Sequence, residues 1–190
     1  MSGIWAKYNL RLAEKPLQTK TLTSFTGFLL GDLVAQAPEI SSGGKWDAWR
    51  TAKMGSFGVL LHGPIGHYWY GFLDRTIMTK APTSALAVAS KTAIDQILWA
   101  PIFTSGFFAY MKTADGKASE IPEEVQSKLW DTMKVNWMTW IPAHIVNFAF
   151  VPSSQRILYI NTIQIGYNAF LSTQQAKAKP VDAGLASITK

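Results

Sequence analysis

Apolar residues gather in four stretches of the chain, and polar or turn-forming segments separate each stretch from the next. The stretches cover residues 21–37, 53–73, 86–111 and 150–171. A helix needs about 20 mainly apolar residues to cross the hydrocarbon core of a bilayer. The pattern therefore predicts an all-α integral membrane protein in which four transmembrane helices form a bundle.

The segment before the first stretch has apolar residues on one helical face only. Trp5, Tyr8 and Leu12 share that face over residues of about 4–15, and Pro16 then leads into the apolar run. Four of the first 20 residues are basic and one is acidic. A basic amphipathic helix is typical of a segment that lies in the plane of a membrane interface. We therefore predict an interfacial helix here.

A second amphipathic segment follows the third stretch. Over about 121–136, apolar positions recur every four residues and charged residues fill the other faces. This helix leads to Trp137 and Trp140, which are typical of the aromatic belt at a membrane surface. We predict that residues 1–173 form a single membrane domain, and that 174–190, with little apolar content, form a mobile C-terminal tail.

Polar residues interrupt all four stretches. A charged group at the centre of a membrane costs about 3 kcal/mol on insertion scales, so it is usually turned inward, paired or hydrated. Buried pairing and the lining of an aqueous path both meet this demand, and the sequence leaves both interpretations open. The residues predicted to be pore-lining or intramembrane polar groups are Asp32, Gln36, His67, Lys91, Asp95, Gln96, His144, Asn147 and Arg156.

The end of the second stretch is unusually rich in aromatic and titratable residues. We expect His67 to face a polar interior of the bundle. Trp69 and Tyr70 suit the level of the lipid headgroups, where amphipathic rings concentrate. Asp74 and Arg75 are expected to end the helix in water.

Prolines and small residues mark the predicted spans. Pro64 and Pro101 each remove one intrahelical hydrogen bond and should kink the helix that contains them, either around a polar centre or simply for packing. Small residues allow helix backbones to approach closely in lipid, although a GxxxG pair also arises by chance in apolar runs. The glycines predicted to pack helices together are Gly27, Gly31, Gly63 and Gly66.

Composition agrees with a membrane protein that carries polar residues inside its spans. Charged residues make up 16% of the 190 residues, aromatic residues make up 13%, and the mean hydropathy is +0.07. A typical soluble domain has about 25% charged residues. The net charge of +6 is scattered rather than clustered, so it favours loops beside anionic lipid over nucleic-acid binding.

The residues do not form a recognisable catalytic or metal-binding motif. The chain has no cysteine, which excludes disulfides, thiolate catalysis and cysteine-based metal sites. His62 and His67 are five positions apart, unlike the four-residue spacing of paired metal ligands on a helix. Because no nucleophile, base and orienting group occur together, we predict that the protein is not an enzyme and has no metal or other cofactor.

Motifs distributed over nearly the whole chain, from about Tyr8 to Ser172, carry a family resemblance. They are Tyr8, Leu12, Pro16, Thr19, Gly31-Asp32, Ala35-Gln36, Asp47, Arg50-Thr51, Gly58, Gly63-Pro64, His67, Trp69-Tyr70, Leu73-Asp74, Lys91, Asp95-Gln96, Pro101, Trp137, Trp140, Asn147-Phe148, Val151-Pro152, Arg156, Asn161, Asn168 and Leu171-Ser172. In this order they resemble the Mpv17/PMP22 family of small integral membrane proteins of mitochondria and peroxisomes.

The chain also departs from the family pattern. The family usually has Trp-Pro followed shortly by Gln, whereas this chain has Trp140-Ile141-Pro142 and then His144. Tyr167 and Phe170 stand where Trp and Tyr are usual. These departures bear on the geometry around 140–150 more than on the fold.

The resemblance implies a four-span channel that passes small metabolites with weak selectivity and supports membrane and metabolite homeostasis. Together with the polar groups in the predicted spans, it suggests anionic or neutral solutes. A non-conducting scaffold or assembly factor is the alternative, and a coupled transporter, which would favour internal repeats, is a weaker one. The expected partners are the lipid bilayer, small solutes and a second copy of the chain. The expected location is the mitochondrial inner membrane, with the peroxisomal membrane second and a plastid envelope third.

Overall fold

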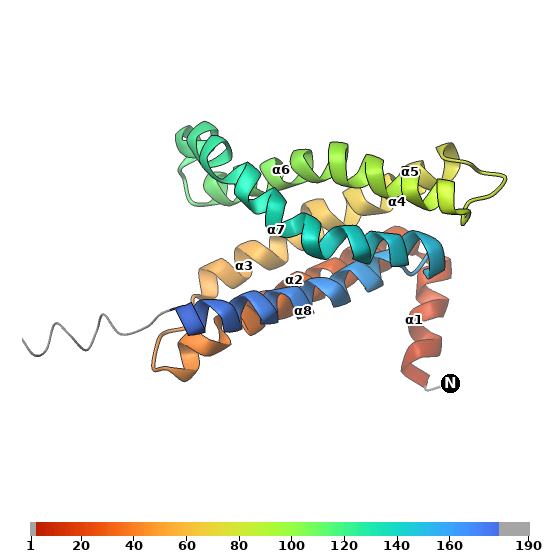
Figure 1. Cartoon of the computed structure of the whole chain (residues 1–190). Helices are drawn as coiled ribbons and strands as arrows, with labels where there is room; N and C mark the ends of the chain where they lie inside the picture. The colour runs from red at the N-terminus through yellow and green to blue at the C-terminus, as the bar shows by residue number, and fades with distance from the viewer. Residues whose placement is uncertain (1–2, 179–190) are drawn as a thin grey trace, which may run out of the picture.

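The computed structural model describes residues 3–178, with side chains for 3–169, and within that range all regular structure is helical (Figure 1). The all-α prediction is therefore confirmed for the described residues. In chain order the elements are α1 (Gly3–Glu14), α2 (Pro16–Ser41), α3 (Ala48–Phe57), η1 (Gly58–His62), α4 (Gly63–Thr76), α5 (Ala85–Ala93), η2 (Ile94–Trp99), α6 (Ala100–Ala114), η3 (Ala118–Glu120), α7 (Ile121–Phe150) and α8 (Arg156–Ala178).

The long helices form a bundle from which α1 projects. Figure 1 shows α2 and α8 side by side along their lengths, and this is the most extensive contact between helices. The continuous rod α3–η1–α4 packs on α2, while α6 packs against α7. The apolar core lies where α4, α5, α7 and α8 meet, and Leu73, Phe148 and Ile157 are almost fully buried there.

Each predicted span lies mainly in helix, but three predicted boundaries differ from the structure. The predicted amphipathic helix of 121–136 is part of α7, which continues through Trp140 and Pro142 to Phe150. The fourth predicted span starts too early, because the chain leaves helical geometry after Phe150 and α8 begins at Arg156. The predicted tail begins too early as well, since α8 runs to Ala178; residues 179–190 lie outside the described residues.

Within residues 3–178, no helix combines the length and the sustained apolar character expected of a membrane-crossing segment.

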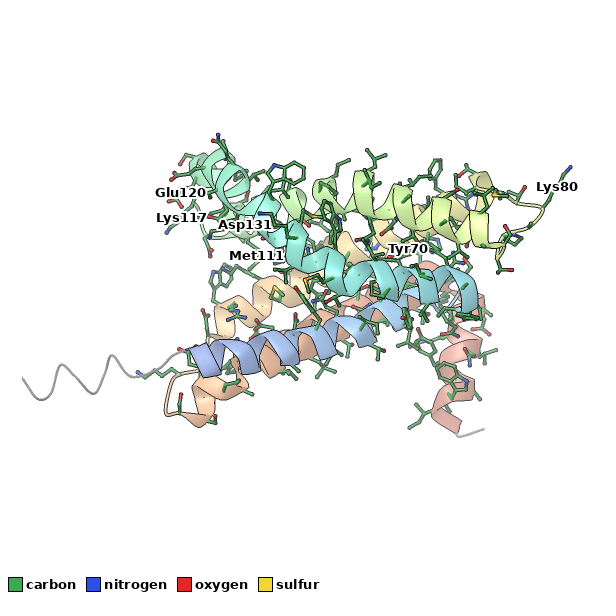
Figure 2. All side chains as sticks on the ribbon, viewed as in Figure 1. Tyr70, Lys80, Met111, Lys117, Glu120 and Asp131 are labelled. Atoms are coloured by element: carbon green, nitrogen blue, oxygen red, sulfur yellow. The ribbon has the colours of Figure 1, made fainter. Side chains whose placement is uncertain are left out.

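Burial is distributed in an unusual way. Among the described side chains, 16 polar or charged residues are buried, compared with 12 hydrophobic ones. At the same time, 24 large hydrophobic side chains are exposed, including Leu60, Ile97 and Met138. Figure 2 shows the side chains of the described residues, many of which extend outward from the helices. The helices therefore turn much of their polar surface toward one another and much of their apolar surface outward.

The prolines Pro64 and Pro101 change helix geometry where the sequence places them. Each follows a π turn, η1 or η2, in which the hydrogen bond spans five residues: Gly63 N–H donates to the carbonyl of Gly58, and Ala100 N–H donates to that of Asp95. A proline has no N–H and its ring collides with the preceding turn, so a wider turn accommodates it. Each rod continues as α-helix beyond the proline.

The four glycines predicted to pack helices together all lie at close approaches. A Cβ atom on Gly27 would collide with Asn161 of α8, and one on Gly31 would lie 2.5 Å from the Asn168 amide nitrogen. On α4, a Cβ on Gly66 would lie 2.7 Å from the side chain of Ile157. These glycines let α8 approach both α2 and α4, as close helix packing requires.

The Gly63→Ala variant is expected to lower the free energy of unfolding by about 1–3 kcal/mol, as overpacked sites usually do. The new Cβ would lie 2.6 Å from Thr21 Cα, which is backbone and can yield only if a helix moves. Gly106→Ala is the matched control on α6, since a Cβ there meets no atom within 4 Å. It should raise stability by up to about 1 kcal/mol. Thermal unfolding in detergent measures both, and equal losses would contradict the packing assignment.

Candidate functional site

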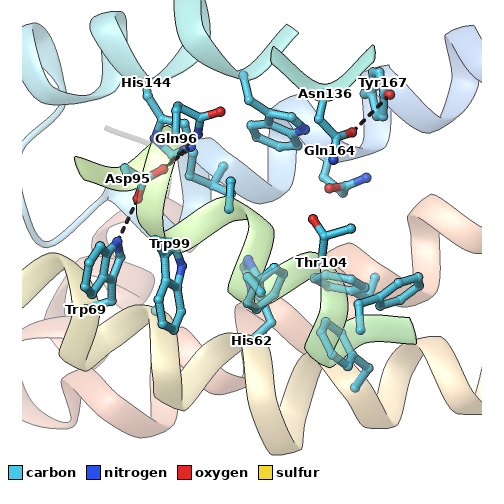
Figure 3. A pocket seen from close by; sticks show the side chains of 18 of the residues that line it. His62, Trp69, Asp95, Gln96, Trp99, Thr104, Asn136, His144, Gln164 and Tyr167 are labelled. Atoms are coloured by element: carbon cyan, nitrogen blue, oxygen red, sulfur yellow. Dashed lines mark hydrogen bonds and ion pairs between the residues drawn. The ribbon is translucent and has the colours of Figure 1, made fainter. Parts of the chain in front are cut away.

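A cavity of about 270 Å³ lies inside the bundle, bounded by α2, α3, α4, α6, α7 and α8 and by both π turns. Figure 3 shows polar side chains at its two ends and aromatic rings between them. The turn η1 contributes His62, and η2 contributes Asp95, Gln96 and Trp99. Because π turns often occur at functional sites, their shared position makes this cavity the candidate site.

The first polar end is organised around the buried carboxylate of Asp95. Its Oδ1 accepts a hydrogen bond from Trp69 Nε1 at 2.7 Å, and its Oδ2 accepts one from Gln96 Nε2 at 2.8 Å. His144 Nε2 lies 3.2 Å from the same Oδ2. Asp95, Gln96 and His144 are each at most 4% exposed. Three donors therefore surround a carboxylate that burial alone would destabilise.

The second polar end is built from neutral side chains of α6, α7 and α8. The Tyr167 hydroxyl donates to Asn136 Oδ1 at 3.3 Å, and Gln164 Nε2 donates to Asn168 Oδ1 at 2.8 Å. Thr104 of α6 lines the same end, as Figure 3 shows. Hydroxyl and amide groups at this end can exchange hydrogen bonds with water or a solute without carrying charge.

Aromatic rings form the wall between the two ends. Trp69 and Trp99 stack with their ring centroids 4.5 Å apart, and the His62 ring lies 5.7 Å from that of Phe103. His62 is fixed in turn by a hydrogen bond of 2.9 Å between its Nδ1 and Ser24 Oγ. The wall is therefore mainly aromatic, and apart from His62 the polar groups described here lie at the two ends.

A separate group, the Asp32 cluster, lies near the loop between α2 and α3. The carboxylate of Asp32 is fully buried, and its Oδ1 lies 2.8 Å from Arg50 Nε. Its Oδ2 accepts hydrogen bonds of 2.6 Å from both Gln36 Nε2 and Thr51 Oγ1. Asp47 completes the cluster, because its backbone N–H donates to Gln36 Oε1 at 2.8 Å. None of these residues lines the cavity.

The Asp74 cluster lies where the end of α4 meets the starts of α5 and α8. Lys91 Nζ lies 2.8 Å from Asp74 Oδ1, and an Arg156 guanidinium nitrogen lies 2.5 Å from Oδ2. The Lys91 side chain is fully buried and that of Arg156 is 6% exposed. Burial by itself raises the pKa of Asp74, but hydrogen bonds from Arg156, Lys91 and Ser153 outweigh it and lower the pKa from 3.8 to about 2.

Comparison with known proteins identifies the family of the chain. The protein SYM1 of Gibberella zeae is 34% identical to this chain over 173 residues, which are 90% of this chain and 97% of that protein. The chain belongs to the Mpv17/PMP22 family. The sequence model of the family matches residues 112–172. PXMP2/4 family protein 2 of Dictyostelium discoideum is 37% identical over 180 residues, 90% of this chain and 91% of that protein.

No solved structure matches the chain. The comparisons confirm the resemblance drawn from the sequence motifs, and as a member of the Mpv17/PMP22 family the chain is an organelle membrane protein. The motif residues include Arg50 of the Asp32 cluster, Lys91 of the Asp74 cluster and Trp69 at the first polar end of the cavity. His144, where this chain departs from the family pattern, contacts the carboxylate of Asp95.

The structure distributes the nine predicted polar residues over different places. Three of them, Asp95, Gln96 and His144, line the cavity, and four belong to the two clusters. Asn147 is fully buried, and its amide has no hydrogen-bond partner. His67 is half-buried against the ring of Tyr68. A pore-lining role for these residues stays a prediction.

Two expectations for the end of the second stretch were wrong, and a third stays a prediction. His62 lines the cavity and His67 does not. Trp69 is bonded to Asp95 and Tyr70 belongs to the buried core, and their position at the level of the lipid headgroups stays a prediction. Asp74 is not free in water at the end of the helix, because it accepts bonds from two buried cations.

Asp74 and Arg50 are not among the nine predicted intramembrane polar residues, although a sequence signal for both was present. Asp74 and Lys91 flank the short connection between the second and third stretches, so a helical hairpin brings them together. Asp32 and Arg50 likewise lie near the two ends of the connection between the first and second stretches, so the hairpin formed there brings them together. Opposite charges at facing ends of adjacent helices would have identified both pairs.

Proposed function

We propose that this Mpv17/PMP22 protein is a weakly selective channel that passes small metabolites across an organelle membrane and thereby supports metabolite homeostasis. In this proposal the parts that cross the bilayer are residues 21–37 of α2, 53–73 of α3–η1–α4, 86–111 of α5–η2–α6 and the part of α8 up to residue 171. The observation that carries the proposal is the cavity of about 270 Å³ with polar groups at both ends. Passage, rather than catalysis, is the role that we assign to it.

The distribution of side chains supports a membrane environment for the bundle. A soluble protein would bury its large apolar residues, because their removal from water is the main source of stability. Here Ile97, Leu98 and Ile102 are more than half exposed on the outer face of η2 and α6, while Asp95 and Gln96 of the same rod are buried. Lipid would cover the apolar face, and the polar face would line the cavity.

The main alternative is a scaffold that holds helices together without conducting. A dry bundle should pair every intramembrane charge, and the Asp32 and Asp74 clusters meet that condition. The cavity differs, because it has a volume of about 270 Å³ and polar side chains line both of its ends. A cavity that is both roomy and polar favours a hydrated interior over a dry one. No comparable observation favours a coupled transporter.

We propose the mitochondrial inner membrane as the location, with the peroxisomal membrane as the alternative. The amphipathic helix α1 supports this, since it carries Lys7 and Arg11 and projects from the bundle. Basic residues on an interfacial helix are attracted to anionic lipid headgroups.

The purified chain is expected to produce discrete conductance steps in planar bilayers, and Asp95→Asn is expected to shift their selectivity toward anions. Among the described side chains that line the cavity, Asp95 is the sole carboxylate, and Lys and Arg are absent. Its negative charge should therefore favour cations over anions along the path. The reversal potential in a potassium chloride gradient measures the shift.

Asp131→Asn serves as the matched control for this experiment. Asp131 lies on the exposed face of α7, where its side chain is 79% exposed. Its removal should leave the reversal potential unchanged. Electrically silent bilayers containing protein that is shown to be folded and inserted would overturn the proposed function in favour of the scaffold.

A further inference from the structure

A second hollow of the molecule, the α1–α2–α8 groove, has a volume of about 500 Å³ and shares no lining residue with the cavity. It lies where α1 meets the paired helices α2 and α8 (Figure 1). Helix α1 contributes Lys7, Tyr8 and Arg11 to its lining, and α2 and α8 contribute the rest. Both basic side chains are exposed, so a molecule that lies in the groove can reach them.

The positive charge at the α1 end of the groove has no counter-charge. Lys7 and Arg11 are four positions apart, which places them on the same face of the helix. Neither side chain makes a hydrogen bond or an ion pair with another described residue. No Asp or Glu is among the described residues that line the groove. An anion at this end would therefore gain two opposite charges without displacing an existing partner.

The hydroxyl groups of the groove already have acceptors for their hydrogens. Thr23 Oγ1 donates to the Thr19 carbonyl at 2.8 Å, so it accepts the bond of 3.2 Å from the Tyr8 hydroxyl. The other threonine hydroxyls of the groove donate to backbone carbonyls of their own helices or of α1. The side-chain donors that remain free for a ligand are therefore those of Lys7 and Arg11.

Beyond α1 the groove continues between α2 and α8 with apolar walls. Leu22 and Leu30 of α2 are 55% and 43% exposed, and Leu158 and Ile165 line the groove from α8. Thr19 and Leu30 are eleven positions apart, so the groove follows about 16 Å of helix at a rise of 1.5 Å per residue. Half of the hydrocarbon core of a bilayer is about 15 Å thick. The groove therefore has the depth of one leaflet.

We propose that the α1–α2–α8 groove is a binding site for an anionic phospholipid, whose phosphate lies between Lys7 and Arg11 and whose acyl chain fills the groove between α2 and α8. A choline headgroup would bring an ammonium group toward two cations and no carboxylate, so zwitterionic lipids bind more weakly. The site differs from the general attraction of a basic helix to a membrane surface, because the charges adjoin an apolar groove that takes a single chain. It goes beyond the proposed channel and does not depend on conductance.

Three matched probes test this proposal on the full chain in detergent, with bound molecules counted by native mass spectrometry. Phosphatidylglycerol is anionic, phosphatidylcholine has the same acyl chains and a zwitterionic headgroup, and glycerol 3-phosphate has the phosphate without the chains. One phosphatidylglycerol should bind about tenfold more tightly than phosphatidylcholine, and glycerol 3-phosphate should bind most weakly. Equal affinities for the two lipids, or glycerol 3-phosphate binding as tight as phosphatidylglycerol, would overturn the proposal.

The double variant Lys7→Gln with Arg11→Gln tests the charged end. Each cation near an anionic headgroup contributes about fivefold in affinity, so phosphatidylglycerol should bind about 25-fold more weakly and phosphatidylcholine nearly as before. Lys45→Gln with Lys80→Gln is the matched control, because it removes the same charge from exposed positions outside the groove. Equal losses in the two double variants would show a general effect of net charge and overturn the site.

The Leu30→Trp variant tests the apolar end, because a larger side chain would block the path of the acyl chain. Leu60→Trp is its control, since Leu60 is 62% exposed on η1 and does not line the groove. Leu30→Trp should weaken phosphatidylglycerol binding about tenfold and Leu60→Trp should leave it unchanged. If Leu30→Trp has no more effect than Leu60→Trp, or if a second copy of the chain covers this face and excludes lipid, the proposal is overturned. The comparison of the three probes on the unmodified chain decides even if a variant fails to fold.

Discussion

Asp74→Asn is expected to lower the free energy of unfolding by about 3–5 kcal/mol, the cost of removing one partner from a buried ion pair. The carboxylate of Asp74 holds two cations, Lys91 at 2.8 Å and Arg156 at 2.5 Å. Without it, both positive groups remain buried beside each other with no counter-charge. Because Asp74 joins α4 to the starts of α5 and α8, the loss should destabilise the whole end of the bundle rather than one helix.

The same carboxylate gives this effect a characteristic pH dependence. The pKa of Asp74 in the folded protein, about 2, is below its ordinary value of 3.8. A lowered pKa means that the stabilisation is complete above pH 3.8 and is lost as the pH falls through about 2. The free energy of unfolding of the unmodified chain should therefore fall as the pH is lowered from 3.8 to about 2. The free energy of unfolding of Asp74→Asn should fall much less over the same pH range. Asp74 lies just beyond the predicted span of 53–73, where it can exchange protons with water.

Thermal unfolding in detergent measures both effects, with Asp131→Asn as the control. Asp131 pairs with Lys134 on one exposed helix face, where such pairs contribute only about 0.3–0.5 kcal/mol. If Asp74→Asn were no more destabilising than Asp131→Asn, the Asp74 cluster could not be a main source of the stability of this end.

The sequence predicts the helices well because their apolar periodicity is local, but it misplaces their ends where packing overrides a local signal. α7 continues through Pro142, although a proline removes a helical hydrogen bond. Contacts from other helices compensate, such as the bond of 3.0 Å from Trp137 Nε1 to the Gln96 carbonyl. His144 and Phe148 beyond the proline are buried, so the helix continues to bring them into the bundle.

The sequence also identifies which polar residues are buried, since each interrupts an apolar stretch, but not which atoms they meet. His62 lies on the π turn of Gly58–His62 and lines the cavity, whereas His67, the residue that the polar interruption of the second stretch predicts for the interior, does not line it. Such a turn leaves no clear periodic signal. The contact between Asp95 and His144 depends on how α7 docks on η2, which local sequence does not specify.

Modification of a cysteine at position 104 is expected to abolish most of the conductance. The native chain contains no cysteine, so Thr104→Cys introduces a single reactive thiol. Thr104 is 8% exposed and lines the cavity, as Figure 3 shows. A water-soluble methanethiosulfonate reacts with the thiolate, so modification requires water at this position. The attached group would then occupy a large part of a cavity of about 270 Å³.

Ile102→Cys on the same helix provides the matched control. Ile102 is 55% exposed and is not among the residues that line the cavity. A group attached there would project into lipid or detergent, away from the path, and should leave the conductance unchanged.

The central claim is that this cavity is the conducting path, and planar-bilayer recording of Thr104→Cys before and after the reagent tests it most directly. We predict discrete conductance before modification, its loss afterwards, and no loss for Ile102→Cys. Unchanged conductance in Thr104→Cys protein that mass spectrometry shows to be fully modified would contradict the claim, as would the absence of conductance from folded, unmodified protein.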